Sequence, residues 1–280
     1  MGNIELSIND INTAVTAALG EDLGNGDITS EAVIPENSQI KLVMVPRQEI
    51  VLAGLPIAAE VFKRLSPDTF VSFEAIDGAL IKSGKIIARI QGPAKEILAG
   101  ERTALNIVQT LSGIATLTRS FVDLIQGTGA VLLDTRKTLP GLRNLSKYAS
   151  KLGGATNHRL SLDDGVLIKD NHIAVVGSAK EATKLAKKAG LKNIEVECDT
   201  IEQIEESLQA GADRLLLDNM SLDELSQAVI KVNKRIPLEA SGGVNLNTIR
   251  RIAETGVDYI SVGAITQSAP AVDIGLDISS

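Results

Sequence analysis

The part of the chain that begins at Val131 alternates short aliphatic runs with helical patterns, and this alternation constrains the fold more than any other feature. Strands and helices that alternate at this pitch form parallel βαβ units. Strands buried in a parallel sheet are apolar on both faces, and we interpret these runs in that way. The expected strands are VLLD (131–134), GVLIK (165–169), IEVEC (194–198), RLLLD (214–218), PLEAS (237–241) and YISVG (259–263).

The positions of the polar residues favour a barrel over an open sheet. In an α/β barrel the C-terminal ends of all strands meet at one mouth, whereas an open sheet gathers them only where its strand order reverses. The segment has about 150 residues against ~250 for a complete eightfold barrel, so we predict an incomplete parallel α/β barrel. The polar residues at the strand ends are Asp134, Lys169, Glu197, Asp218, Ser241 and Gly263 with Thr266.

The first part of the chain is predicted to be an α+β domain. Apolar residues recur at helical spacing from Ile8 to Ala18, and four strand-like runs lie between Gln39 and Gln91. A long helical stretch then covers 95–126, and we expect Ser112 with Gly113 to interrupt it. We therefore place the N-terminal domain at 1–112 and the barrel domain at 113–280, with the last residues packing back on the N-terminal domain.

Composition and charge exclude several classes of protein. The formal net charge of -7 argues against a general role on nucleic acid or on a membrane surface. No segment reaches the ~18 apolar residues of a membrane span, and the first residues lack the basic and apolar regions of a signal peptide. The single cysteine, Cys198, can form neither an intramolecular disulfide nor a metal cluster. We expect a cytoplasmic protein without nucleic-acid or membrane partners.

Basic residues gather in one stretch of this acidic chain, from Asp134 to Arg159. One-sided charge indicates an anion with several negative groups, and Arg binds carboxylate or phosphate with its planar fork. A solvated surface loop would explain any one of these residues, but several cations at strand ends favour an anion site. His158 can serve a ligand or the structure, whereas His172 is expected to be structural. The four cations at strand ends are Arg136, Lys137, Arg159 and Lys169.

Acids and glycines complete the predicted site. Glu197 and Asp218 close successive strands, where they can hold sugar hydroxyls, seat a divalent cation or merely neutralise the lysines. The segments ASGGV (240–244) and ISVGAIT (260–266) follow the last two strands, where barrels commonly bind phosphate. Their small residues let backbone N–H groups approach an anion. The whole set suits a substrate that carries both carboxylates and phosphates.

The sequence resembles the quinolinate phosphoribosyltransferases, also called carboxylating nicotinate-nucleotide pyrophosphorylases. The resemblance implies an N-terminal sandwich-like domain before an incomplete α/β barrel. It also implies transfer of the phosphoribosyl group of 5-phosphoribosyl 1-pyrophosphate to quinolinate with Mg²⁺, which yields nicotinate mononucleotide, pyrophosphate and CO₂ in NAD synthesis. The segments that carry it are ALGEDLGNGDIT, GERTALNIVQTLSGIAT, DTRKTLPGLRNLSKYASKLGGATNHR, LIKDNHI, AGADRLLLDNM, EASGGV and GVDYISVGAITQS.

The resemblance also implies roles for single residues. Arg136, Lys137, His158 and Arg159 would hold the two carboxylates of quinolinate. Glu197 and Asp218 would meet the ribose and Mg²⁺. Arg102 would reach the site of a neighbouring subunit in a homodimer or hexamer. The implied catalytic residues are Lys137, Lys169, Glu197 and Asp218. The implied substrate-binding residues are Arg102, Thr135, Arg136, Lys137, His158, Arg159, Lys169, Glu197, Asp218, Ser241, Gly242, Gly243, Val262, Gly263 and Ala264.

Three positions depart from the family pattern, and three other functions stay open. Ala155, Cys198 and Gln267 stand where the family commonly has Gly, Val and His. The first alternative is a related transferase with a different aromatic acceptor. The second is a barrel lyase that forms a Schiff base through Lys169, which would require a desolvated amine. The third is a phosphate sensor without catalysis, which would not need Glu197 and Asp218.

Overall fold

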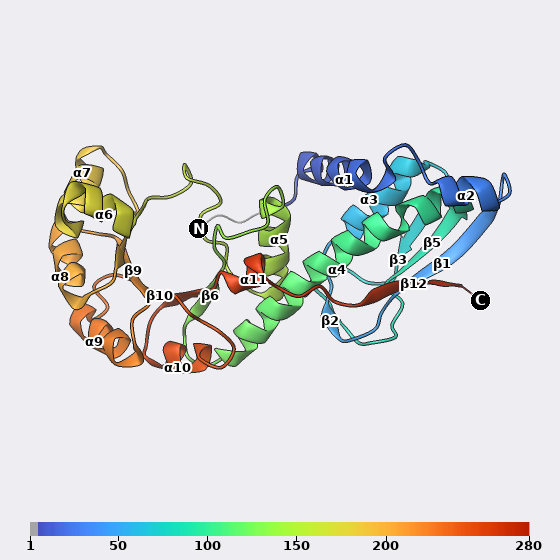
Figure 1. Ribbon diagram of the computed structural model, residues 1–280. Helices are drawn as coiled ribbons and strands as arrows, with labels where there is room; N and C mark the ends of the chain where they lie inside the picture. The colour runs from blue at the N-terminus through green and yellow to red at the C-terminus, as the bar shows by residue number, and fades with distance from the viewer. Residues whose placement is uncertain (1–4, 280) are drawn as a thin grey trace. The chain divides into compact units, whose positions relative to one another are not determined.

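The structure is a computed structural model and describes residues 5–279. Two compact units make up the described chain, and we call them the barrel unit and the N-terminal unit (Figure 1). The barrel unit comprises Ser120–Lys137 and Ala155–Ala264. The N-terminal unit comprises 5–119, Thr138–Gly154 and 265–279.

A parallel sheet of six strands forms the barrel unit, in the order β6-β11-β10-β9-β8-β7. Figure 1 shows α7 to α10 in an arc along the outer side of this sheet. The strands are β6 (Val131–Leu133), β7 (Leu167–Ile168), β8 (Glu195–Cys198), β9 (Arg214–Asp218), β10 (Leu238–Ser241) and β11 (Tyr259–Ser261). The helices are α6 (Asp170–Val176), α7 (Ala179–Lys188), α8 (Ile201–Ala210), α9 (Leu222–Val232) and α10 (Ile249–Glu254).

The sheet is an incomplete barrel, which confirms the predicted fold. β6 and β7 are its two end strands, and they form no ladder with each other in the described residues. Beside β6 the chain adds one parallel bridge, between Leu133 and Thr156. The local signals behave as expected, because Ser221 and Glu224 form a capping box that begins α9. Each βαβ unit thus brings its strand end to the same side of the barrel.

The inner face of the strands is charged, so the expectation of strands that are apolar on both faces is wrong. Successive residues of a strand point to opposite faces, and residues two apart share one face. In β8, Val196 and Cys198 are fully buried on one face, while Glu195 and Glu197 share the other. Glu239 of β10 is fully buried as well. The aliphatic face of the strands therefore packs against the helices, and the charged face lines the interior of the barrel.

An antiparallel sheet of four strands, in the order β12-β1-β5-β3, forms the N-terminal unit together with the pair β2–β4. Apolar side chains such as Met44, Phe62 and Ile90 fill its core. The strands are β1 (Gln39–Pro46), β2 (Ile50–Val51), β3 (Phe70–Phe73), β4 (Leu80–Ile81), β5 (Ala88–Pro93) and β12 (Ile274–Ile278). The helices are α1 (Ile8–Leu23), α2 (Ile28–Val33), α3 (Leu55–Leu65), α4 (Ala94–Leu124), α5 (Arg143–Gly153) and α11 (Ala264–Gln267).

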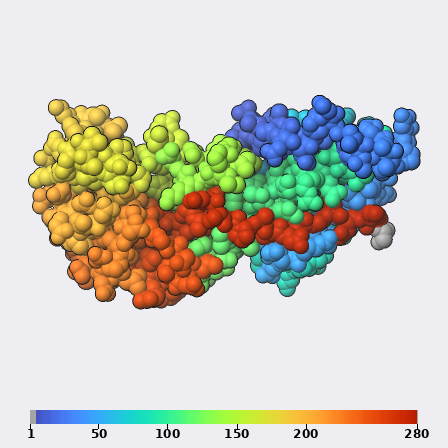
Figure 2. Space-filling view, in the orientation of Figure 1, coloured from blue at the N-terminus to red at the C-terminus, as the bar shows by residue number. Residues whose placement is uncertain are grey.

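The C-terminal residues lie in the N-terminal unit. β12 pairs antiparallel with β1 and places Leu276 opposite Met44. Figure 2 shows the end of the chain running along the surface of this unit as a band of red spheres. None of the helices in 5–279 is both long and apolar enough to cross a membrane.

The predicted interruption of α4 at Ser112 and Gly113 is wrong, because the helix runs unbroken from Ala94 to Leu124. Both residues serve close packing. The Ser112 hydroxyl accepts from Ala53 N–H at 3.0 Å and donates to the Ala53 carbonyl at 3.2 Å. Gly113 has no side chain, and the Pro270 carbonyl occupies the place that a Cβ would take. The boundary placed between 112 and 113 therefore falls inside one helix.

Candidate active site

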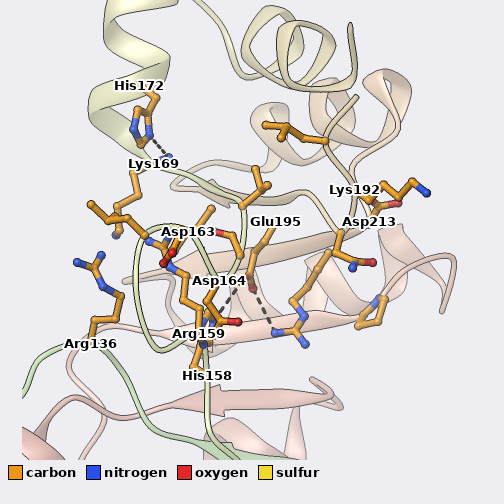
Figure 3. Close-up of a pocket in the computed structure, with 18 of the residues that line it drawn as sticks. Arg136, His158, Arg159, Asp163, Asp164, Lys169, His172, Lys192, Glu195 and Asp213 are labelled. Atoms are coloured by element: carbon orange, nitrogen blue, oxygen red, sulfur yellow. Dashed lines mark hydrogen bonds and ion pairs between the residues drawn. The ribbon is translucent and has the colours of Figure 1, made fainter. Parts of the chain in front are cut away.

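A cavity of about 1010 Å³ lies in the barrel unit, and cations from several separate segments line it. Arg136 follows β6, Arg159 follows the bridge beside β6, and Lys169 follows β7. Figure 3 shows Arg136 and Lys169 toward one end of the cavity and Lys192 with Asp213 toward the other. The strand ends thus bring together three of the four cations singled out in the sequence.

The two arginines are close enough to influence each other. Burial, followed by the positive charge of Arg136, lowers the pKa of Arg159. Arg159 is held by the loop that covers this side of the cavity, because its Nη1 donates to the Gly165 carbonyl at 3.1 Å. Cations that repel each other at one cavity wall are stabilised by an anion between them.

Lys169 is bound to the first of the two predicted acids. Its Nζ lies 2.5 Å from Glu197 Oε2, and Glu197 Oε1 accepts from Asp170 N–H at 3.4 Å. Local structure fixes this lysine, because the Lys169 N–H donates to His172 Nδ1 at 2.9 Å where α6 begins. His172 therefore caps α6, in agreement with the structural role expected for it.

Asp218 adds a second carboxylate to this group. Burial and then the charge of Glu197 raise its pKa, and Lys169 opposes the shift. Asp199 has its pKa raised by the same two causes in the same order. Asn219 Nδ2 donates to Asp218 Oδ2 at 2.5 Å and so fixes the direction of that carboxylate. Glu197 and Asp218 do not line the cavity itself, but they lie beside Lys169, which does. Carboxylates that repel one another at one strand edge are a donor set that fits Mg²⁺, which prefers oxygen ligands.

Two glycine-rich loops follow β10 and β11. Gly242 and Gly243 both have positive φ angles, 92° and 62°, which favour glycine. A Cβ on Gly263 would lie 2.9 Å from Lys137 Cδ, so the absence of a side chain lets Lys137 pack against this loop. Thr135 Oγ1 accepts from the Lys137 N–H at 3.0 Å and shapes the turn after β6. Backbone and a cation thus approach the region where a phosphate was predicted.

The other residues of these loops support them through the backbone. Val262 N–H donates to the Leu133 carbonyl at 3.1 Å, and the Ser241 carbonyl accepts from Asn219 N–H at 2.9 Å. Ala264 begins α11. These contacts hold the β10 and β11 loops beside the ends of β6 and β9.

A second group of ion pairs in the barrel unit involves three residues that the sequence did not single out, Glu195, Arg214 and Glu239. His158 Nε2 lies 3.2 Å from Glu195 Oε2 and 3.4 Å from Glu239 Oε2. Arg214 Nη1 lies 3.1 Å from Glu239 Oε2 and 3.6 Å from Glu195 Oε1. We call these four side chains the buried ion network. A charged residue inside an aliphatic strand, two positions before a polar strand end, was the signal that could have revealed Glu195 and Glu239.

The network shifts the proton affinities of its members. Burial lowers the pKa of His158, but the hydrogen bonds to Glu195 and Glu239 outweigh burial and raise it to about 9. Burial also raises the pKa of Glu195, and the adjacent Glu239 adds to the effect. Burial acts on Glu239 in the same direction, but the hydrogen bond and charge of His158 lower its pKa overall. Glu239 is therefore the member held most firmly as a carboxylate.

The basic stretch does not act as one cluster. Arg143, Lys147 and Lys151 belong to α5 in the N-terminal unit, and Lys147 is fully buried there. Arg102 is also in the N-terminal unit, on the exposed side of α4. Its reach into a neighbouring subunit stays a prediction.

Comparison with known proteins agrees with this geometry. The family model "Quinolinate phosphoribosyl transferase, C-terminal domain" matches residues 114–277, and the model of the N-terminal domain matches residues 27–112. A probable carboxylating nicotinate-nucleotide pyrophosphorylase of Bacillus subtilis is 42% identical over 92% of this chain and 90% of its own length. A carboxylating nicotinate-nucleotide pyrophosphorylase of Mycobacterium leprae is 44% identical over 94% of this chain and 95% of its own.

Solved structures give the same result. The structure of the nicotinate-nucleotide pyrophosphorylase from Francisella tularensis superposes with a TM-score of 0.95 at 38% identity, over 100% of both chains. That from Ehrlichia chaffeensis superposes with a TM-score of 0.93 at 43% identity, over 99% of this chain and 100% of its own.

Proposed function

This chain belongs to the quinolinate phosphoribosyltransferase family, and we propose from that premise that it transfers the phosphoribosyl group of 5-phosphoribosyl 1-pyrophosphate to quinolinate. The products are nicotinate mononucleotide, pyrophosphate and CO₂, a step of NAD biosynthesis. The observation that carries the proposal is the convergence of Arg136, Arg159 and Lys169 on one cavity. A dicarboxylate with a pyridine nitrogen supplies the anion that such a wall requires.

Positioning accounts for the first chemical step. Arg136 and Arg159 bind the quinolinate carboxylates and aim the ring nitrogen at the anomeric carbon, so that the reaction gains from proximity. The nitrogen lone pair forms the new C–N bond as the bond from the anomeric carbon to pyrophosphate breaks. Positive charge develops on the ribose, and Glu197 and Asp218 are the carboxylates of this site that would stabilise it.

Charge at the other end of the substrate is met by lysines and backbone. Lys169 and Lys137 would stabilise the departing pyrophosphate, and Gly242, Gly243 and the Gly263 loop would hold the 5′-phosphate. Mg²⁺, when bound near Glu197 and Asp218, would supply further positive charge to the pyrophosphate oxygens.

The decarboxylation needs no additional group from the protein. The alkylated ring nitrogen is cationic, so it stabilises the electron pair that remains on the adjacent carbon when CO₂ leaves. A solvent proton then replaces the lost carboxylate. The part of the protein is to hold the ring while this happens, through Arg136 and Arg159.

Three further features belong to the proposal. The active unit is a homodimer or a hexamer, and Arg102 of one subunit completes the site of another; its exposed place on α4 supports this. The enzyme works in the cytoplasm, which suits a chain whose one cysteine, Cys198, is buried and free. A Schiff-base lyase is disfavoured because it requires a desolvated lysine, whereas the Lys169 side chain is 45% exposed and its Nζ is paired with Glu197 at 2.5 Å.

The test is to incubate the purified protein with quinolinate, 5-phosphoribosyl 1-pyrophosphate and Mg²⁺ and to measure CO₂ and nicotinate mononucleotide together. We expect equal amounts of the two products. Omission of Mg²⁺ with excess chelator is expected to reduce both together. If 5-phosphoribosyl 1-pyrophosphate binds and neither product forms, the acceptor is another aromatic acid.

A further inference from the structure

Four charged side chains form the buried ion network inside the barrel, and they come from four separate segments of the unit. His158 follows the bridge beside β6, whereas Glu195, Arg214 and Glu239 lie on three adjacent strands. Negative and positive groups alternate around the network, with ion-pair distances of 3.1 to 3.6 Å. Glu195 and Glu239 are 6% and 0% exposed at their side chains. Figure 3 marks the contact between His158 and Glu195 with a dashed line.

Both ring nitrogens of His158 already have partners within the protein. Nε2 faces the two carboxylates, and Nδ1 accepts from the Arg159 N–H at 2.8 Å. Nδ1 can accept from the Arg159 N–H only in the neutral ring, whose proton then lies on Nε2 and points to Glu195 and Glu239. The contact with the Arg159 N–H therefore opposes the rise in the pKa of His158 that the two carboxylates cause. A substrate carboxylate needs a donor, and the donor here is held by two negative groups that would repel the substrate.

The backbone around His158 is fixed from the opposite side. Asp134, which is fully buried at the end of β6, accepts from Asn157 Nδ2 at 2.7 Å and from the His158 N–H at 2.9 Å. The ring is thus held by the network and the main chain by Asp134. Because both the ring and the main chain of His158 are held, the backbone of the next residue, Arg159, is fixed as well. The Arg159 side chain extends from there and lines the cavity.

We propose that His158 is a positioning residue that does not bind substrate itself. Together with Glu195, Arg214 and Glu239 it fixes the Arg159 guanidinium in the place where Arg159 receives a quinolinate carboxylate. The inference rests on the proposed function and changes the role that family resemblance implies for His158.

Physical chemistry supports orientation as the use of the network. Buried ion pairs contribute little net stability, because desolvation offsets their attraction, but in some proteins they specify geometry. Arg214 is also anchored at its other face, with Cζ 4.3 Å from the centre of the Tyr259 ring. His158, Glu195 and Glu239 lie close enough together to hold a metal ion. A cation there would have to share both carboxylates with Arg214, so orientation of the ring is the better account.

The first experiment separates the two roles of His158 by kinetics. The variants are Glu239→Gln, His158→Gln and their combination, and the control is Glu205→Gln, whose exposed carboxylate lies 3.6 Å from Lys231 on the outer helices. Glu239→Gln is expected to raise the KM for quinolinate by about tenfold, the order expected for one lost charge-assisted hydrogen bond. The KM for 5-phosphoribosyl 1-pyrophosphate is expected to stay unchanged, and the double variant to be no worse than the poorer single one. The control should match the wild type.

Direct binding by His158 predicts a different pattern. His158→Gln would then raise the KM for quinolinate while Glu239→Gln left it unchanged, and this result would overturn the proposal. A loss that reaches kcat and both KM values equally, together with a lower Tm, would indicate a purely structural role and would overturn it as well.

The second experiment does not require activity. The chain has two histidines, so ring-nitrogen NMR of isotopically labelled protein can be assigned with His172→Asn. We expect the His158 Nε2 to keep its proton when quinolinate is added, and Glu239→Gln to shift this resonance while Glu205→Gln does not. A resonance that moves with quinolinate and ignores Glu239→Gln would contradict the proposal. If the wild type forms no product, the proposed function fails, but the effect of Glu239→Gln on the ring still tests the network.

Discussion

Asn219 and Gly242, which follow β9 and β10, both have positive φ angles and lie in direct contact with each other. Asn219 has a positive φ of 55°, holds Asp218 at 2.5 Å and lies directly against Gly242. A Cβ on Gly242 would collide with both the side chain and the backbone of Asn219. Asn219 and Gly242 therefore act as a pair, since the absence of one side chain makes room for the residue that directs Asp218.

Gly242→Ala tests this pair. Two effects are expected: a loss of stability of about 1 kcal/mol from the positive φ, and displacement of Asn219 with Asp218. The second effect is expected to raise the KM for 5-phosphoribosyl 1-pyrophosphate by about tenfold, the equivalent of one hydrogen bond to a charged group. Steady-state kinetics and urea unfolding measure the two effects.

The matched control is Gly256→Ala. Gly256 has a similar φ of 93°, but its added Cβ would make only an ordinary contact with Val229. It should lose similar stability and keep the wild-type KM. Equal KM values in the two variants would show that Gly242 is needed for its backbone alone.

Among the helices and strands, some sequence signals indicate one structure, whereas others fit two structures equally well. The ends of β6, β8, β9 and β10 could be read from the sequence because short aliphatic runs, capping boxes and turn glycines agree there. Ser112 and Gly113 could not, because a glycine that ends a helix and a glycine that lets a helix pack closely look the same in a sequence. The residues that settle the matter, Ala53 and Pro270, are distant in the chain.

Gly113→Ala tests the packing of α4. Alanine favours a free helix by about 1 kcal/mol over glycine, so a surface position would gain stability. We expect a loss of about 1–3 kcal/mol instead, as for an overpacked core, because the new Cβ meets the Pro270 carbonyl. Urea denaturation measures the change.

Gly100→Ala in the same helix is the comparison. Its Cβ would approach side chains alone, with the end of the partly buried Leu65 side chain nearest at 2.8 Å, and would meet no distant backbone. It should lose less stability than Gly113→Ala. A more stable Gly113→Ala protein would mean that α4 does not need this close approach.

The whole molecule contains features that a local pattern does not encode. The described chain enters the N-terminal unit three times, with 5–119, Thr138–Gly154 and 265–279. β12 pairs with β1 across more than two hundred positions of sequence. α5, although it lies within the basic stretch of the sequence, belongs to the N-terminal unit. The buried ion network arises in the same way, because the folded barrel unit brings His158 to Glu195 and Glu239 from distant parts of the chain. Strand-end chemistry was accessible to prediction, whereas interior charge pairing was not.

Assembly of subunits supplies a prediction at this scale. Arg102→Ala and Lys169→Ala are each expected to be inactive, and a mixture that exchanges subunits is expected to regain activity. Random pairing of two subunit types makes half of the dimers mixed, and each mixed dimer has one intact site, so about a quarter of wild-type activity should return. Activity is measured before and after exchange, with exchange followed by mass-tagged subunits. No recovery after complete exchange would place Arg102 within its own site.

The central claim is that Arg136 and Arg159 in the barrel cavity recognise the two carboxylates of quinolinate. The most direct measurement is calorimetric titration of the wild-type protein with quinolinate and, separately, with nicotinate, which lacks one carboxylate. We predict that quinolinate binds at least about tenfold more tightly, because the second carboxylate adds a charge-assisted hydrogen bond. Equal affinity for the two acids would contradict the claim, since the cation pair would then not read the second carboxylate.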